Sequence, residues 1–290
     1  GVASSAKKGE KLATGVSTLP DFVKDATDRN RTSPFAFTGN KFEFRTVGSS
    51  DSIASPNTTI NAIVAEAFCE AADRLEKAED FDMAVHDLIK EYMTKHQRIL
   101  FSGNGYSKEW YEEAMRRGLP NIQSTIEAAP TLTTDKAVKL FEKFGIFTRV
   151  ELESREEIIY ETYAKTINIE ALTMIDMAGK DIIPAVAAYT GELANTVVTV
   201  KEAGAPATAQ TELLVEVDSL LAEAKKALKH LEECTVHANK IENAKERAFY
   251  YKDVVDVAMT ALRKPVDKLE MLVDSDIWPM PTYGRLMFEI

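Results

Sequence analysis

The sequence predicts an α+β fold that is strongly dominated by helices, with a short β portion at about 35–46 and long antiparallel helices after it. Three patterns lead to this prediction. Aromatic and charged side chains alternate over 41–45, as on a strand with two unlike faces. Apolar residues recur at helical spacing from Ile60 onward. From about Ala209 they recur alternately every four and three residues, as in a coiled coil.

The composition predicts a globular protein and disfavours several classes of partner. With 290 residues, of which 45% are hydrophobic, the chain can bury one large core or two modest ones. Its 46 acidic residues outnumber the 35 basic ones and give a net charge of -11, which argues against nucleic acid or an anionic membrane surface as the main partner. No apolar run approaches the roughly 18 residues of a membrane span.

Cysteine usage and the start of the chain predict a cytoplasmic protein whose sequence opens inside a loop. Cys69 and Cys234 lie in helix-like patterns, so a reducing compartment is favoured over a disulfide framework. No charged-then-apolar leader opens the chain. Residues 1–28 are rich in Ser, Thr, Gly, Lys and Asp with little periodicity, as in a loop of a larger protein.

The predicted strand has one charged and one aromatic face. Lys41, Glu43 and Arg45 share a face at intervals of about 7 Å, because side chains alternate across a strand. Phe42 and Phe44 share the other face, which can anchor in a core. Cation, carboxylate and cation together could line a site for phosphate and a divalent metal. The alternative is a solvated, self-paired ladder, which the residue pattern alone favours.

Helical spacing begins after Asn57, which together with Thr58 is a candidate N-cap. We expect the helix over about 60–75 to pack against the aromatic face of the strand. A second amphipathic helix is predicted at about 80–98. The Gly-Asn-Gly loop at 103–105 is predicted to be a plain turn, because it lacks the lysine signature of a phosphate-binding P-loop.

Capping and stop signals divide the middle of the chain. A capping box at Thr148 opens a long helix that we expect to kink at Pro184 and to stop at 204–206. Three shorter helices are expected before it, at about 107–117, 124–129 and 134–144.

The second long helix is predicted from about 209, with an apolar seam that continues to 241. Such a seam suits an antiparallel hairpin with the region 254–273, in which Pro265 should cause a bend. The apolar end at 286–290 is expected to dock on the body of the protein.

Three potential metal ligands fall on one helical face. His230, Cys234 and His237 are spaced so that imidazole and thiolate could hold Zn²⁺. Three ligands on one helix are stereochemically awkward, however, and Cys234 lies in the apolar seam. A small buried thiol that simply packs is therefore the favoured interpretation.

Three segments near the start form a recognisable arrangement. They are the loop Asn30-Arg31-Thr32-Ser33, the strand Phe42-Glu43-Phe44-Arg45, and Ser52-Ile53-Ala54-Ser55-Pro56-Asn57 before a helix. This arrangement resembles that of the glutamine synthetases. The resemblance is closer to glutamine synthetase type III, almost throughout 28–66, and it covers nearly the whole chain. Further segments similar to type III are 101–107, 182–185 and 278–284.

The resemblance implies a site for ATP, a divalent metal and glutamate. Glu43 stands where the family has a glutamate that binds Mg²⁺ or Mn²⁺. Arg31 matches an arginine that contacts the phosphates of ATP, and Lys41 matches a basic ATP contact. Arg45 matches the arginine beside the transferring phosphoryl group and the glutamate substrate, so that Arg31 and Arg45 are the implied catalytic residues. Ala36 stands where the commoner bacterial form has a second arginine, so no further phosphate-binding arginine is expected.

The resemblance also implies what the whole enzyme does: an ATP-dependent ligase that joins glutamate and ammonia through γ-glutamyl phosphate. Residues 1–77 would be the end of its catalytic domain, with strands of the catalytic sheet at 35–46, and 78–290 the helical type III C-terminal region. Copies of the parent would assemble into a ringed homo-oligomer, expected to be dodecameric.

Two further expectations concern this chain by itself. In the family, most metal-binding carboxylates lie upstream of the Asn-Arg motif, and each site lies between neighbouring subunits, so we expect the chain alone to be inactive. The alternative to the enzyme interpretation is a helical oligomerisation or interaction module whose charged strand is merely solvated.

Overall fold

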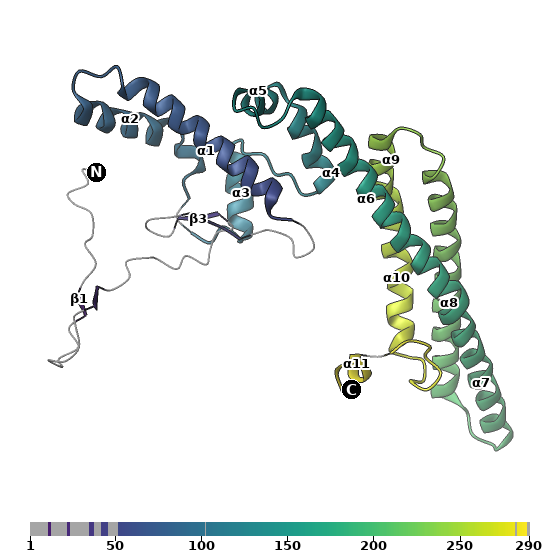
Figure 1. The fold of residues 1–290 in the computed structure, drawn as a ribbon. Helices are drawn as coiled ribbons and strands as arrows, with labels where there is room; N and C mark the ends of the chain where they lie inside the picture. Colours follow the sequence, from purple (N-terminus) through teal and green to yellow (C-terminus); the bar gives the residue numbers. More distant parts are fainter. Residues whose placement is uncertain are drawn as a thin grey trace. The chain divides into compact units, whose positions relative to one another are not determined.

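The computed structural model describes residues 11–12, 22–23, 35–37, 42–45, 52–101, 103–281 and 283–288. The chain divides into two compact units (Figure 1). The first comprises Gly1–Gln123 with Lys143–Ile146, and the second comprises Ser124–Glu142 with Phe147–Ile290. The resemblance places a boundary between residues 77 and 78, where the catalytic domain of the enzyme would end. Compact units defined by contacts within the chain do not test that boundary, which stays a prediction.

The strands are short and form two antiparallel pairs. β1 (Lys11–Leu12) pairs with β2 (Phe22–Val23), and β3 (Phe35–Phe37) pairs with β4 (Phe42–Phe44). The predicted β portion is therefore present as a hairpin. A larger sheet of the kind expected for a glutamine synthetase catalytic domain is not found among the described residues.

Two helices of the first unit begin at side-chain caps. Asp80 accepts a hydrogen bond from the N–H of Met83 at 3.0 Å, and Ser107 accepts one from the N–H of Trp110 at 3.4 Å. Both caps agree with the predicted helix starts. The helical elements of this unit are α1 (Ala54–Leu75), α2 (Phe81–Lys95), the 3-10 turn η1 (Gln97–Ile99) and α3 (Lys108–Arg116).

Helix α1 differs from its prediction in two ways. It begins at Ala54, before the predicted caps, because Pro56 falls in the first turn, where a missing N–H breaks no helical hydrogen bond. Its apolar face is largely exposed, since Ala62 is the one fully buried residue of this helix and Phe68 is 71% exposed. The expected burial of the strand's aromatic face is also incomplete, because Phe44 is 40% exposed.

An aromatic and arginine cluster holds the segment before α3. The rings of Phe101 and Trp110 stack with 4.3 Å between centroids, and Cζ of Arg117 lies 5.5 Å from the Trp110 centroid. Glu113 accepts hydrogen bonds from Arg116 and Arg117 at 2.6 and 2.5 Å, which lower its pKa to about 2. The cluster ties the chain before the 103–105 turn to the face of α3.

From Ser124 the chain forms short capped helices and then a long one. Ser124 Oγ accepts a hydrogen bond from the N–H of Glu127 at 3.3 Å. Thr148 and Glu151 form the complete capping box that the sequence predicts. The elements are α4 (Thr125–Ala128), the 3-10 turn η2 (Ala129–Thr133), α5 (Asp135–Lys143) and α6 (Arg149–Met177).

A π-helical turn, η3 (Ala178–Ile182), joins α6 to α7 (Ile183–Glu202). In this turn the N–H of Ile183 bonds to the carbonyl of Ala178, one residue further back than in an α-helix. Pro184, which has no N–H, follows at once in the first turn of α7. The interruption that the sequence predicts at the proline takes the form of this turn.

The second long helix, α8, runs beside α7 and α10, as Figure 1 shows. The predicted seam is buried: Val217, Ala224 and Leu231 are all 0% exposed. The antiparallel packing of α8 against α10 confirms the predicted hairpin. Its elements are α8 (Thr208–Ala238), α9 (Ala244–Tyr250), the π-helical turn η4 (Tyr251–Val255) and α10 (Asp256–Glu270), which continues through Pro265.

The C-terminal segment docks at a different place from the one predicted. Trp278 is 5% exposed and belongs to the core that includes Val217 and Leu269. Within the predicted docking segment, Leu286 and Phe288 of α11 (Tyr283–Phe288) are 65% and 80% exposed. A short, six-residue helix offers little surface to bury, whereas the indole of tryptophan supplies a large apolar area in one side chain.

One polar cluster around a buried tyrosine links three helical segments of the second unit. Tyr251, in η4, is 1% exposed, and its hydroxyl lies 2.8 Å from Oδ1 of Asn168 and 3.0 Å from Oδ1 of Asn239. Burial raises the pKa of this tyrosine. A phenol that stays protonated can donate its one proton to either of these amide oxygens, so the cluster links η4 to α6 and to the end of α8.

Replacing Tyr251 with phenylalanine is expected to destabilise the second unit by about 1 kcal/mol, because the hydrogen bond that the buried hydroxyl donates to an amide oxygen would be lost. Urea unfolding followed by circular dichroism would measure the change. Tyr189→Phe is the matched control, since Tyr189 is partly buried in the α7 core without a hydrogen bond among the described residues. Equal effects of the two substitutions would contradict this account.

The Glu113 cluster predicts an acid-sensitive contribution to stability. The arginines lower the pKa of Glu113 from 4.5 to about 2, so their stabilisation is complete above pH 4.5 and is lost as the pH falls toward 2. Melting temperatures of wild type and Glu113→Gln should therefore differ at neutral pH and converge in acid. Glu112→Gln is the control, because the nearest cation to Glu112 is Lys108 at 3.8 Å.

Candidate functional site

The register of the β3–β4 hairpin assigns side chains to two faces. Phe35 pairs with Phe44 and Phe37 pairs with Phe42, while Ala36 pairs with Glu43. Residues directly opposite one another on antiparallel strands share a face. Glu43 and Phe44, being adjacent on β4, therefore belong to opposite faces of the hairpin, as the alternation predicts.

Glu43 and Arg45 form a close ion pair on the charged face. Nη2 and Nε of Arg45 lie 2.5 and 3.1 Å from the same oxygen, Oε2 of Glu43. The side chains are 35% and 28% exposed, so solvent reaches both. A residue spacing of two brings their side chains to the same face of the strand, which is why the sequence pattern could predict the pair.

The chemistry of this pair fits the predicted roles. A carboxylate is the kind of hard oxygen ligand that Mg²⁺ and Mn²⁺ prefer. A guanidinium held by a neighbouring carboxylate has a fixed orientation, which suits it to grip phosphoryl oxygens. The same geometry also fits a self-paired surface strand, so the pair alone does not separate the two interpretations.

The other two predicted site residues, Arg31 and Lys41, lie outside the described residues. Within the part of the chain that the structure describes, no group of three or more His, Cys, Asp or Glu side chains could hold a metal ion. Glu43 therefore does not belong to such a group among the described residues.

The cluster at His230, Cys234 and His237 packs as a core cysteine with neighbours. Cys234 is 6% exposed, and its Sγ lies 3.6 Å from Nε2 of His230. His237 instead contacts Tyr250, with 5.0 Å between ring centroids. Burial raises the pKa of the Cys234 thiol, whereas metal binding requires the thiolate. The packing interpretation is therefore supported.

The loop at 103–105 is a turn. Oδ1 of Asn104 accepts a hydrogen bond from the N–H of Tyr106 at 3.0 Å, which is the geometry of a local Asx turn. A Cβ at Gly103 would lie 2.7 Å from the ring of Phe101, so a larger residue there would require that ring to shift. The prediction of a plain turn agrees with this geometry.

Sequence reasoning missed an open cavity in the second unit, lined by Met174, Met177 and Trp278 among others. These residues come from separate segments of the sequence, and each one taken by itself has the pattern of an ordinary core residue.

None of the helices in the described ranges is long and apolar enough to cross a membrane.

Comparison with known proteins gives consistent matches. The family model for the glutamine synthetase C-terminal domain matches residues 84–201. The chain is 38% identical, over 93% of its length, to a glutamine synthetase of Butyrivibrio fibrisolvens. It is 38% identical over 96% of its length to the type-3 glutamine synthetase of Dictyostelium discoideum. A glutamine synthetase of Bacteroides fragilis (strain YCH46) is 36% identical, again over 96% of the chain. In each case the chain spans 39% of the relative's length.

Proposed function

Because the chain belongs to the glutamine synthetase family, we propose that it forms part of an ATP-dependent glutamate–ammonia ligase of type III. One of its relatives is named a type-3 glutamine synthetase. The chain spans 39% of that relative, so the proposed activity is that of the whole enzyme. The observation that carries the proposal is the identity of 36–38% to glutamine synthetases over 93–96% of the chain. The Glu43–Arg45 pair is consistent with it, because the pair joins an oxygen ligand and a guanidinium on one strand face.

The proposed reaction has two steps. A γ-carboxylate oxygen of glutamate bonds to the γ-phosphorus of ATP while the bond to the ADP oxygen breaks, which gives γ-glutamyl phosphate and ADP. Ammonia then attacks the carbonyl carbon of the acyl phosphate, phosphate leaves, and loss of a proton from nitrogen gives glutamine. Both steps concentrate negative charge on phosphoryl oxygens, and fixed cations stabilise that charge.

The charged residues of the strand region would divide this work. Arg45 would neutralise the transferring phosphoryl group and orient the glutamate substrate, from a position that Glu43 fixes. Arg31 and Lys41 would hold the phosphates of ATP. Glu43 would supply one ligand to Mg²⁺ or Mn²⁺, which would neutralise part of the negative charge of the phosphates.

The cross-strand partner of Glu43 supports its role as a ligand. Ala36 stands directly opposite Glu43 in the hairpin, at the position where the resemblance leads one to expect an arginine in the commoner bacterial form. An arginine there would place a second cation beside the carboxylate. Alanine adds no charge at this position, so the cation beside the Glu43 carboxylate on this strand is Arg45.

The proposal includes partners for the whole enzyme. They are glutamate, ATP and ammonia, together with further copies of the chain in a cytoplasmic ringed homo-oligomer, dodecameric in the parent. An assembly role for the helices is the second candidate function. It is favoured by exposed apolar side chains on α1 and α2, among them Phe68, Phe81 and Ile89.

The 290-residue chain alone is expected not to form glutamine from glutamate, ammonia and ATP, because it spans 39% of its relatives and its described residues contain no group of three or more metal-binding side chains. A coupled assay for ADP release, with the whole enzyme as the positive control, would check this. Metal-dependent glutamine formation by the purified chain would show that the site is more complete than we propose.

In the whole enzyme, Glu43→Ala and Arg45→Ala are each expected to lower kcat by about 100-fold or more, because each removes a contact to the transferring phosphoryl group or its metal. Arg45→Lys should recover only part of the activity, since an ammonium cannot grip two oxygens. Glu79→Ala, on the exposed turn before α2, is the matched control.

Steady-state kinetics and size-exclusion chromatography on each variant separate catalysis from assembly. Wild-type kcat in both alanine variants would support the helical interaction module instead.

A further inference from the structure

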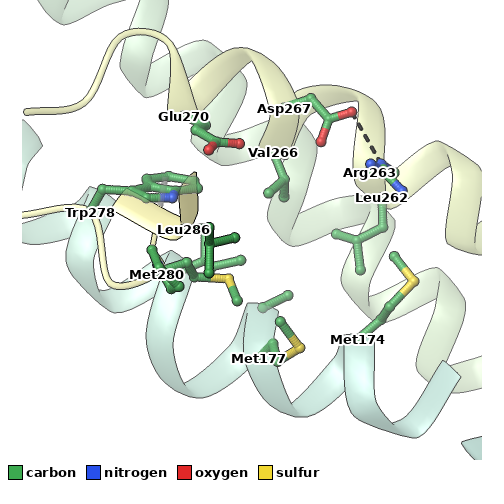
Figure 2. A pocket seen from close by; sticks show the side chains of 13 residues that line it. Met174, Met177, Leu262, Arg263, Val266, Asp267, Glu270, Trp278, Met280 and Leu286 are labelled. Atoms are coloured by element: carbon green, nitrogen blue, oxygen red, sulfur yellow. Dashed lines mark hydrogen bonds and ion pairs between the residues drawn. The ribbon is translucent and has the colours of Figure 1, made fainter. Parts of the chain in front are cut away.

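The second unit contains an open cavity of about 360 Å³ between α6, α10 and the C-terminal segment. As Figure 2 shows, Met174 and Met177 come from one side, α10 forms the opposite side, and Trp278 with Met280 closes one end. Val266 and Leu262 complete an apolar lining. A cavity of this size that is mostly apolar has the character of a small-molecule site.

The polar groups of the cavity all come from α10. Arg263, Asp267 and Glu270 line one edge, one helical turn apart (Figure 2). Nε of Arg263 lies 3.3 Å from Oδ2 of Asp267, so these two charges neutralise each other. Among the described residues Glu270 has no ion-pair partner, and the edge therefore carries one uncompensated negative charge.

The lining itself also favours a cation. The face of an indole attracts a positive charge more strongly than any other aromatic side chain. Thioether sulfurs are polarisable and adapt to ligands of varied shape. The net charge of -11 on the whole chain adds a long-range attraction for cations and a repulsion for anions.

We propose that this cavity binds a small apolar molecule that carries one ammonium group. The apolar body lies against Met174, Met177 and Val266, and the ammonium lies between the Glu270 carboxylate and the ring of Trp278. This inference does not depend on the proposed ligase activity, because every residue that it uses belongs to the second unit.

Tryptophan fluorescence can test the proposal directly. The sequence contains two tryptophans, so Trp110→Phe leaves Trp278 as the only one, and phenylalanine keeps an aromatic ring against Phe101. Three probes of matched length would be titrated into this variant of the full chain: hexylammonium, 1-hexanol and hexanoate. None of them absorbs where tryptophan does.

Hexylammonium is expected to change Trp278 emission saturably, with hexanol binding several-fold more weakly and hexanoate not at all. Glu270→Gln in the same background should weaken hexylammonium binding by about fivefold, the size of a partly exposed charge pair. Glu223→Gln, on the exposed face of α8, is the control and should bind as the parent does.

Three results would overturn the proposal. Equal affinity for the ammonium and the alcohol would show a merely apolar cavity. Unchanged hexylammonium binding in Glu270→Gln, with circular dichroism showing a native fold, would remove the charge from the argument. Trp278 emission that depends on protein concentration, together with a dimer in sedimentation experiments, would show that a second copy of the chain covers the cavity.

Discussion

Burial of the apolar seam of α8 is the constraint on which the second unit depends. Val217, Ala224 and Leu231 have no exposed surface, and the helices on either side, α7 and α10, pack against α8 along its length. A fully buried valine or leucine contributes about 1.5–3 kcal/mol relative to exposure. Isolated helices gain little from propensity alone, so α7 and α10 owe their positions to this contact. The buried Tyr251 hydroxyl and the docked Trp278 then attach the remaining segments to it.

The charged strand follows a different constraint, the two-residue period of β structure. Glu43 and Arg45 meet because they are two positions apart, and no other part of the chain is needed to bring them together. An ion pair that depends only on this local geometry can form on a short strand of a two-stranded hairpin. What such a strand does not provide is a second carboxylate, since its opposite neighbour is Ala36.

Local signals in the sequence predicted most of the helix boundaries and the Glu43–Arg45 pair. The cap at Ser107 and the capping box at Thr148 depend on side chains within three residues, so they could be read directly. The start of α1 was wrong because proline in a first turn is tolerated, and the sequence pattern gave a later cap more weight.

Features that depend on distant partners could not be predicted in this way. Helical periodicity identifies the apolar face of α1, but it does not say what covers that face, and Phe68 is exposed. The hydrogen bond between Tyr251 and Asn168 joins residues 83 positions apart, and neither residue type signals a partner. The cavity at Trp278 has the same origin, because three separate segments contribute to it.

The π-helical turn η3 has a consequence for how the long rod of α6 and α7 keeps its register. Ala164, Ala171 and Ala178 are buried at intervals of seven residues, whereas Val186 follows Ala178 after eight, and Leu193 follows after seven again. The π-helical turn therefore accommodates one extra residue in the seven-residue pattern. In a regular α-helix this residue would rotate every later side chain by about 100° about the helix axis. The buried positions thus follow one seven-residue repeat in α6 and a second one, shifted by one residue, in α7. Loss of one residue from 178–182 would merge the two repeats into a continuous helix, whereas the same loss within α6 would turn half of the rod away from its partners.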